Sequence, residues 1–431
     1  MSRIAFARHA PIDCFDILGD ELAIGGLPLS RLAARVGRTP FYAYSRQAII
    51  GRVAALRQAL PPAVKLHYAM KANPMPAVVG LLAGLTDGLD VASAGEMRVA
   101  LDTGVSPRHV SFAGPGKSPA EIEQAVAAGI TLNLESVRQY RDALAAGRKL
   151  AIAPRLAVRV NPAFELKSSG IRMGGGPKPF GIDEAQVPDL LARMAADGLD
   201  PVGLHIYSGS QNLDAAAITQ AQRETVDLAC RLAAPLRSPL EWVNIGGGFG
   251  VPYFPGDRPL ALEPIGLALA PLAERVQEQL RAPLVLELGR YFVSEAGIYV
   301  ARVVDRKVSQ GQVFLVTDGG LHHNLAASGN FGQVIRKNYP VAIGNRIAGV
   351  ATGTQLQVQS DTQSATPSNT RSETQSVVGP LCTPLDLLAD RVDLPVAAVG
   401  DLVVVFMAGA YGPSASPVSF LSHPAPVEVL V

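Results

Sequence analysis

The sequence of 431 residues has few cysteines and few charged side chains. The three cysteines, Cys14, Cys230 and Cys382, are far apart and odd in number, which argues against a disulfide framework and favours a reducing compartment. Charged residues make up 17% of the chain, the formal net charge is +1, and there is no basic block. We therefore expect neither nucleic acid nor an anionic membrane as a partner.

The sequence also lacks long uninterrupted apolar runs. The first residues do not show the apolar core of a signal peptide, and the longest apolar stretch, Leu394 to Tyr411, is interrupted by Gly400 and Asp401. This stretch is more typical of two strands around a turn than of a membrane span. We expect a cytoplasmic protein with no membrane partner.

Hydrophobic residues make up 48% of the chain, and this length favours two domains. From Val64 onward, apolar strands alternate with amphipathic helices, which predicts a parallel sheet. Eight such units favour an α/β fold of the (β/α)8 TIM-barrel type. An open doubly wound sheet is the alternative, although no dinucleotide fingerprint follows the first strand. The predicted strands are Val64–Met70, Leu89–Ser93, His109–Ala113, Ile130–Glu135, Leu156–Asn161, Val202–Ser208, Trp242–Gly246 and Leu284–Leu288.

The pattern changes after Arg290. Residues 291–431 contain β-branched runs separated by glycine and proline, which predicts an all-β domain. Residues 1–38 are expected to join this domain as an N-terminal arm, and residues 39–290 to form the barrel. A polar segment at about 355–375 is predicted to be a solvated or disordered insertion.

The first barrel strand is predicted to end at Lys71, in a loop at the mouth of the barrel. A lone lysine at a strand end usually extends its ammonium into water. In a barrel, however, the carboxyl ends of the strands carry the chemistry, and other unusual residues fall at the same ends. Lys71 is therefore our candidate for a Schiff-base lysine that holds pyridoxal 5'-phosphate (PLP).

Two further strand ends carry candidate cofactor ligands. Gly246, Gly247 and Gly248 follow the seventh strand, where loops of barrels commonly bind phosphate, although a glycine turn alone is more often just a tight turn. The run from Glu287 through Gly289 to Arg290 closes the eighth strand. Glu287 is suited to a pyridine nitrogen and Arg290 to a phosphate, whereas the simpler interpretation is a surface ion pair.

The remaining candidates lie within predicted strands or at their ends. His205 and Ser208 end the sixth strand, where the histidine is either a core residue or a ring that stacks on a cofactor. Asp90 is placed to orient Lys71 or the cofactor, and Arg159 is expected in the barrel mouth, where a cation needs a partner. The adjacent His322 and His323 have no carboxylate or cysteine at ligand spacing, so we expect no metal site.

Taken together, the motifs resemble the fold type III PLP-dependent decarboxylases, the group that contains diaminopimelate and ornithine decarboxylases. The motifs appear in the order YAMKAN, DVASAGE, RVNP, HIYSGS, NIGGGFG, ELGR, GPLCTPLD and GAYG, from about residue 40 to the C-terminus. The chain is most similar to a subset found near acyl-carrier-protein and exopolysaccharide (exosortase) genes. The resemblance implies an alanine-racemase-like barrel with a β domain, and a homodimer with two shared active sites.

The resemblance also implies residue roles. Lys71 forms the Schiff base, His205 stacks on the ring, Glu287 contacts the pyridine nitrogen, and Cys382 comes from the partner subunit to protonate the product. The implied cofactor ligands are Lys71, Asp90, Arg159, His205, Ser208, Gly246, Gly247, Gly248, Glu287, Gly289, Arg290 and Tyr411.

One departure from the family pattern concerns the substrate. Relatives that act on diamino acids have an acidic residue after the cysteine, where this chain has Thr383, and Arg336 and Tyr339 lie in a basic stretch expected near the substrate. The predicted reaction is removal of the α-carboxylate from an amino acid, as in diaminopimelate, ornithine or lysine decarboxylases. The alternative substrate is an amino acid tethered to an acyl carrier protein, such as a glutamyl thioester. A racemase is disfavoured by Glu287, and a non-catalytic PLP-binding homologue is disfavoured by the retained Lys71.

Overall fold

The computed structural model describes residues 4, 6, 8–165, 171, 172, 174–347 and 372–431. The contacts within the chain divide it into two units. The barrel unit comprises Ile50–Val251 and Pro259–Phe292, and the β unit comprises Met1–Ile49, Pro252–Arg258 and Val293–Val431.

The barrel unit is built on a parallel sheet that closes on itself. The sheet contains nine strands, and pairing of β8 with β9 closes a ring that leaves only the short β11 (Ile182–Asp183) outside, so eight strands form the barrel. This confirms the predicted fold class. The barrel strands are β5 (Lys65–Ala69), β6 (Gly88–Val91), β7 (Val110–Phe112), β8 (Thr131–Leu134), β9 (Arg155–Asn161), β12 (Gly203–Ile206), β14 (Trp242–Gly247) and β15 (Leu284–Leu288).

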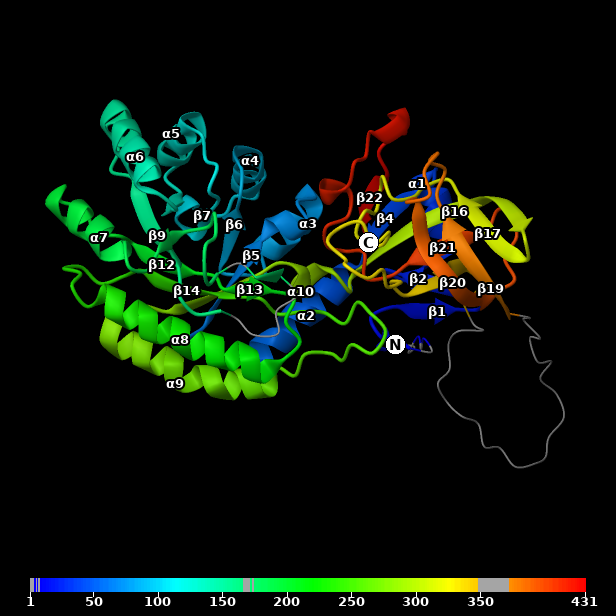
Figure 1. Ribbon diagram of the computed structural model, residues 1–431, viewed down its shortest axis with the longest axis horizontal. Helices are drawn as coiled ribbons and strands as arrows, with labels where there is room; N and C mark the ends of the chain where they lie inside the picture. The colour runs from blue at the N-terminus through cyan, green and yellow to red at the C-terminus, as the bar shows by residue number, and fades with distance from the viewer. Residues whose placement is uncertain (1–3, 5, 7, 166–170, 173, 348–371) are drawn as a thin grey trace. The chain divides into compact units, whose positions relative to one another are not determined.

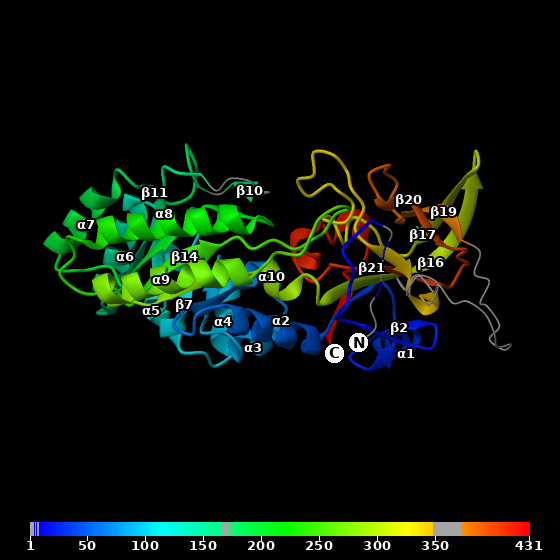
Figure 2. The ribbon, with the colours of Figure 1, turned by 90° about the horizontal axis from the view of Figure 1, so that it is seen from below.

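Helices lie on the outside of these strands, and α8 and α9 run side by side (Figures 1 and 2). Every residue of β6 and β8 is buried, as expected for strands covered on both faces, and this burial includes the polar Asp90 and Asn133. The helices are α2 (Arg46–Ala59), α3 (Pro76–Ala83), α4 (Ala94–Asp102), α5 (Pro119–Ala128), α6 (Val137–Leu150), α7 (Val187–Ala196), α8 (Ala215–Ala233), α9 (Glu263–Leu280) and the short α10 (Arg290–Val293).

Local sequence sets the helix ends. The Ser118 hydroxyl accepts a hydrogen bond from the backbone N–H of Glu121, and the Glu121 carboxylate accepts one from the backbone N–H of Ser118, which forms a capping box at the start of α5. The same helix ends at Gly129, whose φ of 73° is a left-handed conformation that glycine adopts without strain. Helix α9 begins at Glu263 with Pro264 next to it, because a proline is accommodated in the first turn of a helix.

The β unit contains an eight-stranded sheet and a smaller N-terminal sheet. The long β16 is central: it pairs with β17, β21 and β4. The large sheet consists of β4 (Phe41–Tyr44), β16 (Gly297–Ser309), β17 (Gln312–Thr317), β18 (Val341–Ile343), β19 (Ser372–Val378), β20 (Leu387–Pro395), β21 (Leu402–Val405) and β22 (Val427–Leu430). The N-terminal arm contributes β1 (Asp16–Leu18), β2 (Glu21–Ile24), β3 (Leu27–Pro28) and α1 (Leu29–Val36).

Two expectations about boundaries need correction. The barrel was expected to begin at residue 39, but the strand Phe41–Tyr44 pairs with β16 and β22 of the β unit, where all four of its side chains are buried. The predicted polar insertion at 355–375 lies mostly outside the described residues, and its last four residues, 372–375, begin β19. Among the described helices, none combines the length and the apolar character needed to cross a bilayer.

Candidate active site

The first element of the site is the lysine that follows β5. This strand ends at Ala69, and a single 3-10 turn (Met70–Ala72) carries Lys71 past its carboxyl end. The Lys71 side chain is 43% exposed, and its Nζ lies 3.9 Å from Oε1 of Glu287. The ammonium also lies 5.7 Å from the centre of the Tyr207 ring. The lysine is therefore accessible and has an acidic partner.

The acid, Glu287, lies one residue before the end of β15, beside β5. Its carboxylate is almost fully buried, Oε2 lies 2.9 Å from Nε2 of His205, and Asn244 donates a hydrogen bond of 3.4 Å to the same oxygen. Burial acts to raise the pKa of Glu287, but the His205 ring and the charges of Lys71 and Arg159 outweigh burial and hold that pKa well below its usual range. Glu287 is therefore a carboxylate at neutral pH.

His205 lies in β12, in register with Asn244 and Arg159 of the neighbouring strands. Its side chain is 2% exposed, and neither ring nitrogen makes a hydrogen bond within the described part of the chain. The approach to Glu287 is thus close but lacks the alignment of a hydrogen bond. Buried polar atoms are nearly always paired, so this ring fits a site that another molecule completes.

The glycine loop at the end of β14 is shaped by close contacts that exclude side chains. A Cβ on Gly247 would lie 2.3 Å from the carbonyl oxygen of Glu287, and one on Gly246 would lie 2.9 Å from the Tyr207 ring. Gly246 and Gly248 have φ angles of +68° and +74°. Only glycine fits this path, which leaves the backbone open at the barrel mouth as in anion-binding loops.

The next loop brings Arg290 close to the Lys71 turn. A Cβ on Gly289 would lie 2.9 Å from Cβ of Ala72, so the absence of a side chain lets the end of β15 pack against that turn. Arg290 is the first residue of α10. Ser208 was predicted to end the sixth strand, but β12 ends two residues earlier, and Ser208 lies between it and the short β13 (Gly209–Ser210). The Ser208 carbonyl accepts a hydrogen bond from the backbone of Gly174.

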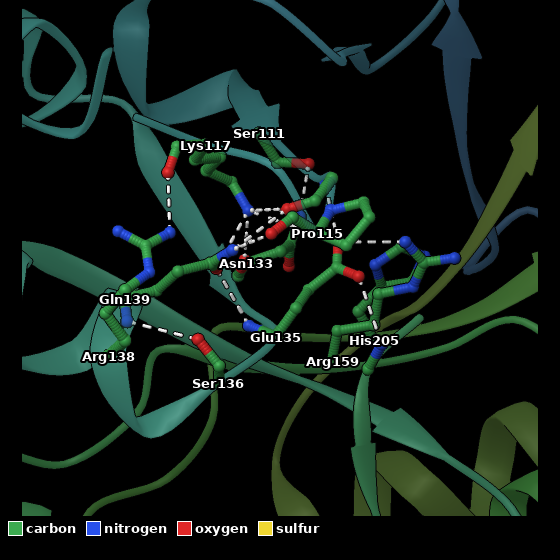
Figure 3. A network of polar contacts seen from close by, with 12 residues as sticks. Ser111, Pro115, Lys117, Asn133, Glu135, Ser136, Arg138, Gln139, Arg159 and His205 are labelled. Atoms are coloured by element: carbon green, nitrogen blue, oxygen red, sulfur yellow. Dashed lines mark hydrogen bonds and ion pairs between the residues drawn. The ribbon is translucent and has the colours of Figure 1, made fainter. Parts of the chain in front are cut away.

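Arg159 has the partner that its position in the barrel mouth requires. Its Nη1 donates to Oε1 of Glu135 at 2.9 Å, and its guanidinium lies 5.2 Å from the centre of the Phe180 ring. Figure 3 shows Glu135 between Arg159 and Lys117, with His205 next to Arg159. The sequence did not single out Glu135 or Lys117, because a charged residue at a strand end or in a loop is ordinarily solvated.

Asp90 lies in β6 of the same barrel, in register with Ala69 of the neighbouring β5. Its Oδ1 accepts a hydrogen bond of 2.6 Å from Ser111 and lies 3.2 Å from Nδ1 of His67, while its Oδ2 is buried with no hydrogen bond among the described residues. Burial lowers the pKa of His67, but the Asp90 carboxylate outweighs burial and raises it above its usual range. His67 was not among the predicted site residues, although its place in β5 beside the strand of Asp90 could have indicated it.

The other predicted residues lie in the β unit. Cys382 is exposed, and the hydroxyl of Thr383 accepts a hydrogen bond from the backbone of Leu385. Arg336 donates to the carbonyls of Ser328 and Leu387 and to the side chain of Asn338. The guanidinium therefore connects its own loop to the first residue of β20.

The two tyrosines differ in their surroundings. Tyr339 is 7% exposed and stacks on Tyr253 with ring centres 5.0 Å apart. Tyr411 has a φ of +54° and lies 6.0 Å from the Phe331 ring. Among the described residues, no group of three or more histidine, cysteine or acidic side chains is arranged to hold a metal ion.

Comparison with known proteins assigns the chain to a family. A family model described as the pyridoxal-binding domain of pyridoxal-dependent decarboxylases matches residues 46–294. The L-glutamyl-(BtrI acyl-carrier protein) decarboxylase of Niallia circulans is 37% identical over 401 residues, 91% of this chain and 88% of the relative. The diaminopimelate decarboxylase of Aquifex aeolicus is 34% identical over 417 residues, 95% of this chain and 90% of the relative.

A solved structure agrees with these matches. The diaminopimelate decarboxylase of Helicobacter pylori, complexed with L-lysine, superposes with a TM-score of 0.78 at 27% identity, covering 93% of this chain and 94% of that one. The family model covers more than half of the chain, and the relatives match it over almost their whole length. The chain therefore belongs to the family of pyridoxal-dependent decarboxylases.

Proposed function

We propose that this protein binds PLP at the mouth of its barrel and removes the α-carboxylate of an amino acid that is attached to an acyl carrier protein. One observation carries the first part of the proposal: an accessible lysine and a buried, ionised glutamate lie 3.9 Å apart at neighbouring strand ends. The second part is supported by the Niallia circulans relative, a decarboxylase named for an L-glutamyl acyl-carrier-protein substrate.

The residues at the barrel mouth fit PLP. The glycine path at 246–248 leaves no room for side chains, and His205 presents a buried ring whose nitrogens have no hydrogen bond among the described residues. We assign the phosphate to the loop at 246–248 together with Ser208, Arg290 and Tyr411. The remaining contacts are assigned to Asp90, Arg159 and Gly289. When bound, PLP withdraws electrons from the bond between Cα and the carboxylate of an attached amine.

The protein's own residues supply the rest of the mechanism. The Lys71 amine is exposed enough to bind the cofactor covalently and to be displaced by a substrate amine. Glu287 stays ionised because Lys71, Arg159 and His205 surround it, so it holds a proton on a neighbouring ring nitrogen. His205 covers one face of the site and excludes water there. Cys382 holds the proton that replaces the departing carboxylate.

Substrate choice rests on residues of the β unit. Thr383 follows Cys382 and offers a hydroxyl where relatives acting on diamino acids have a carboxylate, so a distal ammonium has no anion there. A carrier-bound amino acid has no such requirement at its thioester end. The free amino acid is the second candidate, favoured by the Aquifex aeolicus diaminopimelate decarboxylase at 34% identity.

The deciding experiment measures CO2 release from the purified protein supplied with PLP. Free L- and D-amino acids, diamino acids included, are compared with L- and D-glutamate loaded on an acyl carrier protein through the side-chain carboxylate, which leaves the α-carboxylate free, and Lys71→Ala is the inactive control. We expect release from the carrier-bound acid only. Release from a free diamino acid overturns the carrier assignment, whereas deuterium exchange at Cα without CO2 release overturns decarboxylation.

The Thr383 assignment has its own test. Thr383→Glu restores an acidic side chain after Cys382 and is expected to increase CO2 release from free diamino acids relative to the wild type. Thr383→Gln is the matched control, since it adds length without charge. No gain from the glutamate variant contradicts the assignment of Thr383 to substrate choice.

We propose that the active unit is a homodimer in which Cys382 of one subunit serves Lys71 of the other. Mixing the inactive variants Lys71→Ala and Cys382→Ala tests this arrangement, because random exchange of subunits restores one intact site in about half of the dimers, or about a quarter of the wild-type sites. Recovery of activity is the expected result. Mixed dimers that form but stay inactive contradict a shared site.

A further inference from the structure

Lys117 is a buried cation that the proposed mechanism leaves without a role. It follows β7, its side chain is 1% exposed, and it contacts none of the proposed cofactor ligands except through other residues. Its Nζ donates to the carbonyl of Gly114 at 2.7 Å, to the carbonyl of Asn133 at 2.8 Å and to Oε1 of Gln139 at 3.1 Å. A lysine can donate three hydrogen bonds only as an ammonium, so this cage of neutral oxygens fits the charged form.

The ammonium faces one carboxylate, that of Glu135, at 4.0 Å (Figure 3). Glu135 is itself 1% exposed and is fully occupied: Oε1 accepts from Arg159 and from the backbone of Gly114, and Oε2 accepts from the backbone of Gly181 at 3.0 Å. Gly114 therefore links the two groups directly, since its carbonyl accepts from Lys117 and its N–H donates to Glu135.

Arg159 extends this arrangement to the active site. Its residue pairs in register with His205 of the adjacent strand, and its positive charge is one of the influences that lower the pKa of Glu287. Charges of opposite sign thus alternate near the carboxyl ends of the strands in the order Lys117, Glu135, Arg159, Glu287. Buried charges of this kind are stable only when each has a partner, so removing the first loosens the next.

We propose that Lys117 is a positioning residue, which fixes Glu135 and thereby Arg159 at the barrel mouth, and whose charge strengthens binding of the anionic cofactor there. This inference rests on the proposed PLP site. It extends that proposal to a residue that touches neither the cofactor nor the substrate, and it predicts that cofactor affinity depends on the protonation of Lys117.

The surroundings of Lys117 place its titration in an accessible pH range. Burial lowers the pKa of Lys117 to about 7; Glu135 and, more weakly, Glu121 oppose this shift, while Arg159 and Arg138 add to it. Below pH 7 the ammonium is present and all three hydrogen bonds are made. Above pH 7 the amine keeps two donors, loses its charge, and contributes less to holding Glu135. The contribution of Lys117 to cofactor affinity is therefore full on the acid side and fades as the pH rises.

The test compares the PLP dissociation constant of the wild type with that of Lys117→Met at about pH 6 and about pH 8.5, measured by absorbance on protein freed of cofactor. Protonation of PLP itself affects both proteins and cancels in the ratio. We expect the variant to bind roughly tenfold more weakly at the lower pH, the size typical of residues that orient a ligand's partners. The ratio should decline with a midpoint near pH 7.

Lys149→Met is the matched control, because Lys149 pairs with Glu123 on the surface and its side chain is 66% exposed. This variant should bind PLP as the wild type does at both pH values. A Lys117→Met protein that folds and shows an unchanged dissociation constant, or a ratio that does not vary with pH, overturns the inference, because a packing role alone carries no protonation step.

Glu135→Gln tests the route and serves if Lys117→Met does not fold. The amide keeps the size of the side chain but removes the charge between the two cations, so it should weaken PLP binding and abolish the pH step. In the Glu135→Gln background, Lys117→Met should have little further effect, whereas additive losses would show that Lys117 does not act through Glu135. A wild type that binds no PLP refutes the proposed function, which separates that failure from the failure of this inference.

Discussion

Strand β9 carries two arginine–glutamate pairs, one near each end, and their surroundings differ. Arg155 opens the strand and binds Glu241 through two hydrogen bonds of 3.0 and 2.7 Å, with the glutamate side chain 45% exposed. Arg159 lies four residues further along the same strand. It binds Glu135 through a hydrogen bond of 2.9 Å, and the side chain of that glutamate is only 1% exposed. The pairing chemistry is the same, but only the second pair is removed from water.

The difference shows how a barrel separates stability from function. At the amino end of β9 the Arg155–Glu241 pair is solvated, and such pairs contribute little to stability. At the carboxyl end, Glu135 needs Arg159, two backbone N–H groups and Lys117 to remain charged in the interior. That arrangement costs desolvation energy, and we propose that it serves to hold a fixed charge beside His205 and Glu287.

The largest expected effect comes from removing the charge of Glu287, which lies beside this arrangement. Glu287→Gln keeps the size of the side chain but cannot hold a proton on a ring nitrogen, so we expect kcat to fall by about 1,000-fold. Glu241→Gln, the same substitution at the exposed end of the barrel, should leave kcat unchanged. The measurement is steady-state CO2 release with saturating PLP. A Glu287→Gln protein with near-normal kcat would show that the carboxylate does not act on the cofactor.

The second largest expected effect is on stability, and it compares substitutions of the two arginines. Arg159→Met leaves Glu135 buried without its main ion-pair partner, and we expect the free energy of unfolding to fall by about 3 kcal/mol. Arg155→Met exposes Glu241 to water and should cost no more than about 1 kcal/mol. Urea unfolding of both variants without PLP measures the two costs. Equal losses would mean that burial does not distinguish the pairs.

Much of the barrel could be predicted from the sequence because its strands are buried. Strands covered on both faces appear as apolar runs, so Leu284–Leu288 was predicted to the residue. Polar residues within or just after such runs stand out, which is why Lys71, His205 and Glu287 were predicted, and the structure brings these three side chains together.

Glu135 and Lys117 could not be recognised in the same way. Glu135 was expected to be the last residue of a strand, and Lys117 lies in a glycine- and proline-containing loop, where a charged side chain is usually solvated. Their burial arises from contacts with residues far apart in the chain, such as Gly181 and Arg159. The start of the barrel was predicted wrongly for a related reason. Phe41–Tyr44 has the sequence of a strand, but its partners are β16 and β22, which lie more than 250 residues later in the chain.

The smallest expected effect concerns the solvated pair and its response to salt. Glu241→Gln should lower the free energy of unfolding by about 0.5 kcal/mol at low ionic strength, because Arg155 then keeps a hydrogen bond but loses the charge of its partner. At about 1 M salt the Debye length shrinks to roughly 3 Å, so this loss should nearly vanish. The loss in Arg159→Met should persist at the same salt concentration, since ions do not reach Glu135 in the interior. Urea unfolding of each variant and the wild type at both ionic strengths gives the four differences. A salt-independent loss in Glu241→Gln would show that the exposed pair acts through fixed hydrogen-bond geometry, and the contrast between the two ends of β9 would then lie in packing and not in solvation.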